Sequence, residues 1–169
     1  MKIVFYGGKQ AGMVALLTLL AQGQEIVCVV PIDEVVASVA EDLKLNVKKV
    51  NDVNDPQFVD YLNGLKPDLF FCCHGRQIIK EPLLALTQAI NLHPCLYKYK
   101  GKDPVVRLLA DGEKKASVGA HIMTKKVDDG EVLVEEFIET QGKTPAEVYS
   151  DLYPLYAIVT IKVLEKIKL

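Results

Sequence analysis

The sequence predicts an α/β fold in which a mostly parallel sheet carries helices on both faces. Short apolar runs alternate with amphipathic segments of helix length, which is the pattern of βαβ units joined by right-handed crossovers. The run Glu25–Val30 is almost continuously apolar, as expected of a strand buried on both faces. The chain has 169 residues, without internal repeats or linkers, which suits one sizeable core. We therefore expect a single domain over residues 1–169.

The first half of the chain supplies most of the expected parallel sheet. The expected strands are Lys2–Tyr6, Glu25–Val30, Asn46–Val50 and Asp68–Cys73, and the expected helices are Ala11–Gln22, Asp33–Leu43 and Pro56–Leu65. The start of the third helix is marked by Asp55 and Pro56. Aspartate is a good N-cap, and the fixed φ of proline suits the first helical position.

The rhythm changes after a fifth strand, Ala89–Leu92. Two further strands, Ala116–Met123 and Glu131–Ile138, are separated by a short segment with the turn signal Asp129-Gly130. They are too close for a helical crossover, so we expect them to be antiparallel or linked by a loop. Thr144 to Glu147 then form a capping box that starts a last helix. Pro154 falls inside this helix, where we expect a kink or a break.

Composition excludes several classes of protein. The formal net charge of −2 gives no basic excess for binding nucleic acid. No apolar stretch approaches the roughly 20 residues that span a bilayer, and the N-terminus does not show the pattern of a signal peptide. Cys28, Cys72 and Cys73 lie in apolar runs, which is typical of reduced, buried cysteines. We expect a cytoplasmic protein without a membrane or nucleic-acid partner.

Glycines after the first strand raise the hypothesis of a dinucleotide site. Gly7, Gly8 and Gly12 are present, and Asp33 lies where an acid could bind a ribose. However, Lys9 occupies the position of the second glycine, where a side chain obstructs the approach of a pyrophosphate. We favour a tight turn between strand and helix.

A zinc site is the second alternative. Cys72 and Cys73 are consecutive, so strand alternation sends their thiols to opposite faces. The residues His93, Cys95 and His121 could meet in space, but they do not have the spacing typical of zinc ligands. We expect no metal.

The third candidate is a polar cluster formed by Asn91, His93, His121 and Asp128. Asn91 and His93 share one face at the carboxyl end of a strand, where ligands bind in open α/β sheets. His121 lies late in the next strand, and Asp128 lies in the turn that follows. An amide, an imidazole and a carboxylate could together stabilise an oxyanion and move a proton, as acyl transfer requires. The alternative is that both histidines are hydrogen-bonded core residues.

The motifs "INLHP", "KYKGKDPV" and "HIMTKKVDDGEVL" resemble the folate-dependent formyltransferase family, as do "MKIVFYGG" and "PDLFFCCHGRQIIKEPLL". The resemblance extends over nearly the whole chain. It implies a formyltransferase-type, Rossmann-like fold and 10-formyltetrahydrofolate as formyl donor. It also implies that His93 stabilises the oxyanion, that Asn91 orients the formyl group, and that Asp128 holds the imidazole or a water. His121 would support them.

Binding residues also follow from the resemblance. The pterin ring of the donor would be held by the backbone around Arg76, Gln77 and Ile78 and by the loop with Lys126, Val127 and Asp129. Phosphates of the acceptor could bind Lys98, Lys100 and Lys102, although a lysine run is more often a solvated surface. The sequence departs from the family pattern at Cys95 to Lys98, at Ser117 and at Gly119, which puts acceptor binding in question more than the chemistry.

The set of candidate acceptors is reduced by two elements that members of the family use and that this sequence lacks. The connection after the second expected strand is short and acidic, unlike that of the transferases acting on methionyl-tRNA. The turn "YGGKQAG" is not the phosphate loop of the enzymes acting on glycinamide ribonucleotide. A nucleotide-linked amino sugar or another small amine is the leading acceptor. A 10-formyltetrahydrofolate hydrolase, a non-catalytic folate or nucleotide-binding module, and a homodimer all remain open.

Overall fold

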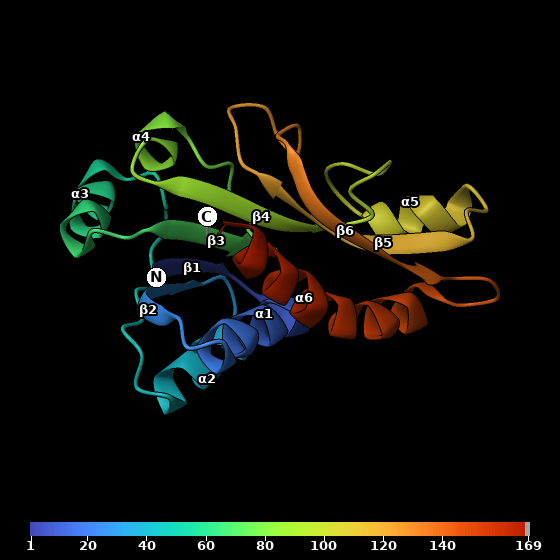
Figure 1. Cartoon of the computed structure of the whole chain (residues 1–169), viewed down its shortest axis with the longest axis horizontal. Helices are drawn as coiled ribbons and strands as arrows, with labels where there is room; N and C mark the ends of the chain where they lie inside the picture. Colours follow the sequence, from blue (N-terminus) through green and yellow to red (C-terminus); the bar gives the residue numbers. More distant parts are fainter. Residues whose placement is uncertain (168–169) are drawn as a thin grey trace.

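The computed structural model describes residues 1–167, which form a six-stranded sheet in the order β2-β1-β3-β4-β5-β6 (Figure 1). The strands are β1 (Lys2–Gly7), β2 (Glu25–Pro31), β3 (Leu69–Cys73), β4 (Gln88–Pro94), β5 (Lys115–Ile122) and β6 (Val132–Glu139). Strands β1 to β4 pair in parallel, whereas β5 runs antiparallel to both β4 and β6. The expected mostly parallel α/β sheet is confirmed, and so is the antiparallel last pair.

Six helices connect or follow these strands in the described residues. They are α1 (Lys9–Ala21), α2 (Glu34–Asp42), α3 (Pro56–Leu65), α4 (Glu81–Leu84), α5 (Pro104–Ala110) and α6 (Pro145–Ile167). Both predicted helix starts are confirmed. The Asp55 carboxylate accepts hydrogen bonds from two backbone N–H groups of α3, and Thr144 and Glu147 bond each other reciprocally. None of these helices is long and apolar enough to cross a membrane.

Two of the expectations for secondary structure are wrong. The predicted strand Asn46–Val50 makes only a single bridge, from Val47 to Val29, because its lysines keep most of it in solvent and β2 remains the edge of the sheet. Of the kink or break predicted at Pro154, the break is absent, since α6 continues through it, and the kink stays a prediction. Pro154 is exposed, so water can bind the carbonyl that loses its partner, while buried neighbours such as Leu152 and Leu155 hold the helix.

Each face of the sheet has its own apolar core. One core joins Phe5, Phe71 and Leu92 of the sheet to helices α1, α2, α5 and α6, and we call this side the α1/α6 face. The other core joins Tyr6 and Phe70 to α3 and α4, and we call it the α3/α4 face. Figure 1 shows α1, α2 and α6 on the opposite side of the sheet from α3 and α4. The buried core of the α3/α4 face contains no residue of β5 or β6. The helices of that core therefore do not cover the polar side chains of these two strands.

We predict that Asp55→Ala destabilises the protein by about 1 kcal/mol, because two N–H groups at the start of α3 lose their acceptor. Urea unfolding followed by circular dichroism measures the loss. Asp60→Ala is the matched control, since Asp60 is an exposed aspartate within the same helix and should change stability by less than about 0.5 kcal/mol. Equal losses in the two variants would contradict the capping role.

Candidate active site

Asn91 and His93 come to one face through the alternation of β4. Their neighbours Ile90 and Leu92 pack in the core of the α1/α6 face, so the amide and the imidazole lie on the α3/α4 face. His121 lies directly opposite Asn91 in the antiparallel pair of β4 and β5. Its ring nitrogen Nε2 is 3.2 Å from Nδ2 of Asn91. The structure thus brings together the three residues that the sequence pattern placed on this face.

Asp128 reaches the same cluster from the turn between β5 and β6. Its Oδ2 lies 3.2 Å from Nε2 of His93, and its Oδ1 lies 3.4 Å from Nε2 of His121 and from Nδ2 of Asn91. The backbone of Asp128 has φ +51, a left-handed conformation that aspartate tolerates better than most residues. Gly130 fixes the turn, because a Cβ atom there would fall 1.7 Å from the carbonyl oxygen of Ile122.

Gly101 completes the cluster through its backbone, and sequence reasoning missed it. Its N–H donates to Oδ2 of Asp128 at 2.8 Å, and its carbonyl oxygen lies 3.1 Å from Nε2 of His93. That nitrogen therefore faces two acceptors, so we assign the ring hydrogen of His93 to Nε2. The signal in the sequence was the glycine in "KYKGKDP", because glycine is the usual residue in a left-handed turn. In the structure the φ of Gly101 is +79.

The electrostatics favour an ionised Asp128 beside a neutral His93. Burial raises the pKa of Asp128, but the contacts with His121 and His93 and the N–H of Gly101 outweigh burial and lower the pKa to about 2. Burial lowers the pKa of His93, and the nearby Asp128 carboxylate only partly offsets it. Near neutral pH the site thus holds a carboxylate surrounded by N–H groups.

The first predicted pterin-binding segment follows β3, and part of its backbone is already hydrogen-bonded. The N–H groups of Arg76 and Gln77 both donate to the hydroxyl of Tyr6, at 3.0 and 3.1 Å, and the carbonyl of Ile78 accepts from Asn54. The side chain of Ile78 is 62% exposed. Among the described residues, the carbonyls of Arg76 and Gln77 and the N–H of Ile78 make no hydrogen bond, so contacts of these three residues with the donor remain a prediction. Tyr6 is a further residue that sequence reasoning missed.

The second predicted segment borders the cluster. Lys126, Val127 and Asp129 are exposed on the turn that carries Asp128. Lys100 donates to Asp129 at 2.8 Å and so ties this turn to the loop that carries Gly101. A role of Lys126, Val127 and Asp129 in donor binding remains a prediction.

The three lysines proposed for the acceptor phosphates do not lie together. Lys100 lies next to the cluster, and Lys102 is fully exposed beside Asp103. Lys98 instead pairs with Glu113, which lies just before the start of β5. His121 lies near the end of β5, and the start and the end of this strand are about 20 Å apart. We accordingly remove Lys98 from the expected acceptor contacts.

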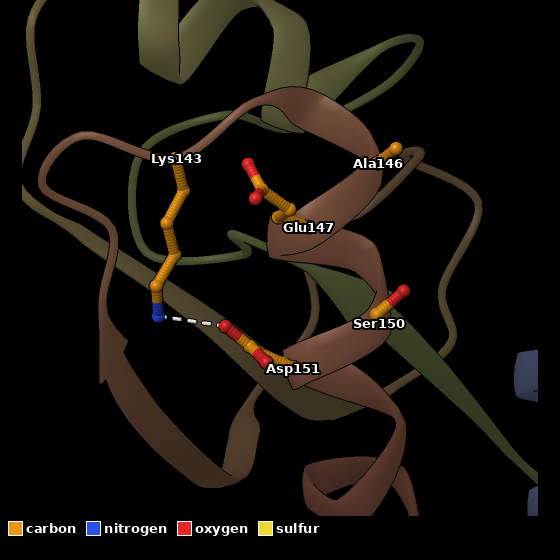
Figure 2. Close-up of a pocket in the computed structure, with 5 residues that line it drawn as sticks. All are labelled: Lys143, Ala146, Glu147, Ser150 and Asp151. Carbon is orange, nitrogen blue, oxygen red and sulfur yellow. Dashed lines mark ion pairs between the residues drawn. The ribbon is translucent and has the colours of Figure 1, made fainter.

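Two surface hollows lie away from the cluster. One, of about 340 Å³, lies at the start of α6 between residues that include Lys143, Glu147 and Asp151 (Figure 2). Its charges are internally compensated, because Lys143 pairs with Asp151 at 2.6 Å and Glu147 bonds Thr144. The other, of about 220 Å³, lies beside Asp33 at the end of β2. Neither contains a residue predicted for the site. Within residues 1–167 there is also no group of three histidine, cysteine, aspartate or glutamate residues suited to hold a metal ion.

Comparisons with known proteins identify the family and the fold. A family model described as formyl transferase matches residues 1–153. The bifunctional polymyxin resistance protein ArnA of Wigglesworthia glossinidia brevipalpis is 31% identical over 166 residues, covering 90% of this chain, which spans only 25% of that protein. Glycinamide ribonucleotide transformylase 1 from Symbiobacterium toebii has a TM-score of 0.86 at 16% identity, with 96% of this chain and 85% of that chain covered.

Two further solved structures share the fold. A sugar N-formyltransferase from a Shewanella species has a TM-score of 0.77 at 20% identity, with 96% of this chain and 67% of that chain covered. A formyltetrahydrofolate deformylase from Pseudomonas syringae has a TM-score of 0.82 at 18% identity, with 96% and 59% covered. The match to the family model over residues 1–153 confirms the resemblance of the motifs, and the chain belongs to the formyl transferase family.

Proposed function

We propose that this chain transfers the formyl group of 10-formyltetrahydrofolate to the primary amine of a small acceptor, with residues 1–169 as one catalytic domain. The observation that carries the proposal is that Asp128 lies within 3.4 Å of both Asn91 and His93 in a largely buried cluster on the α3/α4 face. A protein that only binds folate gains nothing from N–H donors held around a carboxylate at the end of a strand.

The geometry suits stabilisation of an oxyanion. When the acceptor amine attacks the formyl carbon, the electron pair of the C=O π bond moves to the oxygen. Nδ2 of Asn91 and Nε2 of His93 donate to the Asp128 carboxylate, and in this proposal they share these hydrogens with the formyl oxygen as it gains negative charge. Collapse of this intermediate reforms the carbonyl and breaks the bond to the folate nitrogen.

Asp128 supports this step by orientation. The folate nitrogen must gain a proton as it leaves, and the attacking amine must lose one. A carboxylate with a pKa of about 2 is a weak base at neutral pH, so Asp128 does not retain that proton. Its role is to fix both imidazoles and to orient a water through which the proton passes from the amine to the folate nitrogen.

The turn after β1 argues against one class of acceptor. The N–H of Lys9, the first residue of α1, donates to the carboxylate of Asp33 at 2.7 Å. Asp33 therefore supplies the negative charge that a phosphate group would otherwise bring to this helix N-terminus. A nucleotide-linked amino sugar, held in part by Lys100 and Lys102, is our leading acceptor, and glycinamide ribonucleotide and methionyl-tRNA come after it.

A hydrolase that uses water as acceptor is the second candidate, favoured by the shared fold with a formyltetrahydrofolate deformylase. Incubation of the protein with 10-formyltetrahydrofolate and a panel of amines, followed by mass spectrometry, separates the candidates. A formyl adduct on an amine supports transfer. Formate released at a rate that no amine changes supports the hydrolase, and binding without turnover supports a non-catalytic module.

We predict that His93→Ala lowers turnover by roughly 10²–10³ while the affinity for tetrahydrofolate stays within about twofold, because an oxyanion donor acts mainly in the transition state. Turnover is measured from formation of the formyl adduct, and affinity by calorimetry. Near-normal turnover in a variant with an unchanged circular dichroism spectrum would remove His93 from the mechanism.

We predict that Asp128→Asn lowers turnover by roughly 10²–10⁴, since the amide keeps the shape of the side chain but loses the charge that holds His93 and orients the water. Asp129→Asn is the matched control, because Asp129 is exposed and pairs only with surface lysines among the described residues. Both variants are compared by steady-state kinetics and thermal unfolding. Similar activities would show that the carboxylate of Asp128 is a structural group.

A further inference from the structure

A third imidazole lies at the same edge of the sheet. His74 directly follows Cys73, the last residue of β3, and Cys73 is in register with Leu92, which precedes His93. His74 and His93 therefore end neighbouring parallel strands, which are about 5 Å apart. The mechanism above makes no use of His74.

The backbone at His74 is held in an unusual conformation. Its φ is +59, a left-handed conformation that is uncommon for a residue with a side chain. The next residue, Gly75, packs so tightly that a Cβ atom would lie 2.6 Å from the ring of Tyr6. Because the chain follows this path, the ring of His74 does not continue the alternation of β3.

The ring of His74 is turned toward α6. Its Nε2 lies 2.9 Å from the hydroxyl of Tyr156, and the two ring centroids are 5.7 Å apart. Tyr156 is fully buried and belongs to the core of the α1/α6 face, whereas Asn91 and His93 lie on the α3/α4 face. His74 and His93 thus lie at the same end of the sheet but on opposite faces.

Tyr156 determines which nitrogen of His74 carries the hydrogen. Burial, together with the nearby charge of Lys9, lowers the pKa of His74 to about 4, so its ring is neutral at neutral pH. Since the described residues offer the buried hydroxyl of Tyr156 no other acceptor, we assign its hydrogen to the bond with Nε2, which leaves the ring hydrogen of His74 on Nδ1. Among residues 1–167, Nδ1 makes no hydrogen bond, and His74 is only half-buried. An N–H donor is therefore available beside the reaction centre.

We propose that His74 binds the acceptor, its Nδ1–H donating to an oxygen next to the reacting amine, and that Tyr156 is a positioning residue that fixes the tautomer. This inference rests on the proposed function. The predicted contacts of the folate donor lie on the turns at the α3/α4 face, so the acceptor approaches His93 from the α1/α6 side. An amino sugar, with a hydroxyl on the carbon beside its amine, has the chemistry that such a donor recognises.

The test uses variants that keep the left-handed backbone. His74→Gly removes the ring without strain, and His74→Asn tolerates φ +59 and places an amide N–H near the position of Nδ1. We expect His74→Gly to raise KM for the formylated amino sugar roughly tenfold, as for the loss of one hydrogen bond, with KM for 10-formyltetrahydrofolate unchanged. His74→Asn should restore most of the affinity.

Tyr156→Phe should also raise KM for the amino sugar, because the ring of His74 loses its fixed tautomer. Tyr149→Phe is the control on the same helix and should behave as the wild type. The substrates are uridine- and thymidine-diphosphate amino sugars, screened first with the wild type. An unchanged KM for the amino sugar in His74→Gly, or an equal rise in KM for the donor, overturns the inference while the proposed function stands. Transfer only to amines without a neighbouring oxygen also overturns it, and transfer to no amine at all overturns both.

Discussion

The carboxylate of Asp128 is the group on which the site depends. It contacts His93 and Asn91 of β4, His121 of β5 and the N–H of Gly101, and so links two strands and two loops. A buried charge is costly unless it is hydrogen-bonded, and here every neighbouring group is an N–H donor or an imidazole. The loop that carries Gly101 and the turn that carries Asp128 therefore order each other, and they hold the residues of the proposed site together.

The rest of the geometry of the site comes from the sheet, because the strand direction reverses between β4 and β5. Parallel strands β1, β3 and β4 end at one edge, where His74 and His93 lie side by side. Since β5 is antiparallel to β4, it can place His121 directly opposite Asn91 without a crossover helix. Apolar residues of β4 and β5, such as Ile90, Leu92 and Val118, pack in the α1/α6 face, so a well-packed core lies behind the polar cluster.

The residues that depart from the family pattern contact one another or share a partner in the structure. Leu96 packs so closely on β5 that a Cβ atom at Gly119 would lie 2.7 Å from it, and Ser117 donates to Glu135, which also accepts the N–H of Tyr97. These contacts hold the loop after β4 on the sheet. The residues that depart from the family pattern therefore anchor the loop that carries Gly101. This role is structural and does not require a change in chemistry.

Local signals in the sequence determined most of the elements and the polar pair of β4. Asp55 before Pro56, the capping box at Thr144 and the alternation of Asn91 and His93 depend on residues only a few positions apart, so they can be recognised without a fold. The isolated bridge at Val47 and the uninterrupted helix at Pro154 depend on solvent exposure and packing, which no local pattern contains. The pairs Gly101 with Asp128 and His74 with Tyr156 join residues 27 and 82 positions apart. Only the tertiary structure could reveal them, because a hydrogen bond requires two groups within about 3 Å, and folding alone brings such distant residues together.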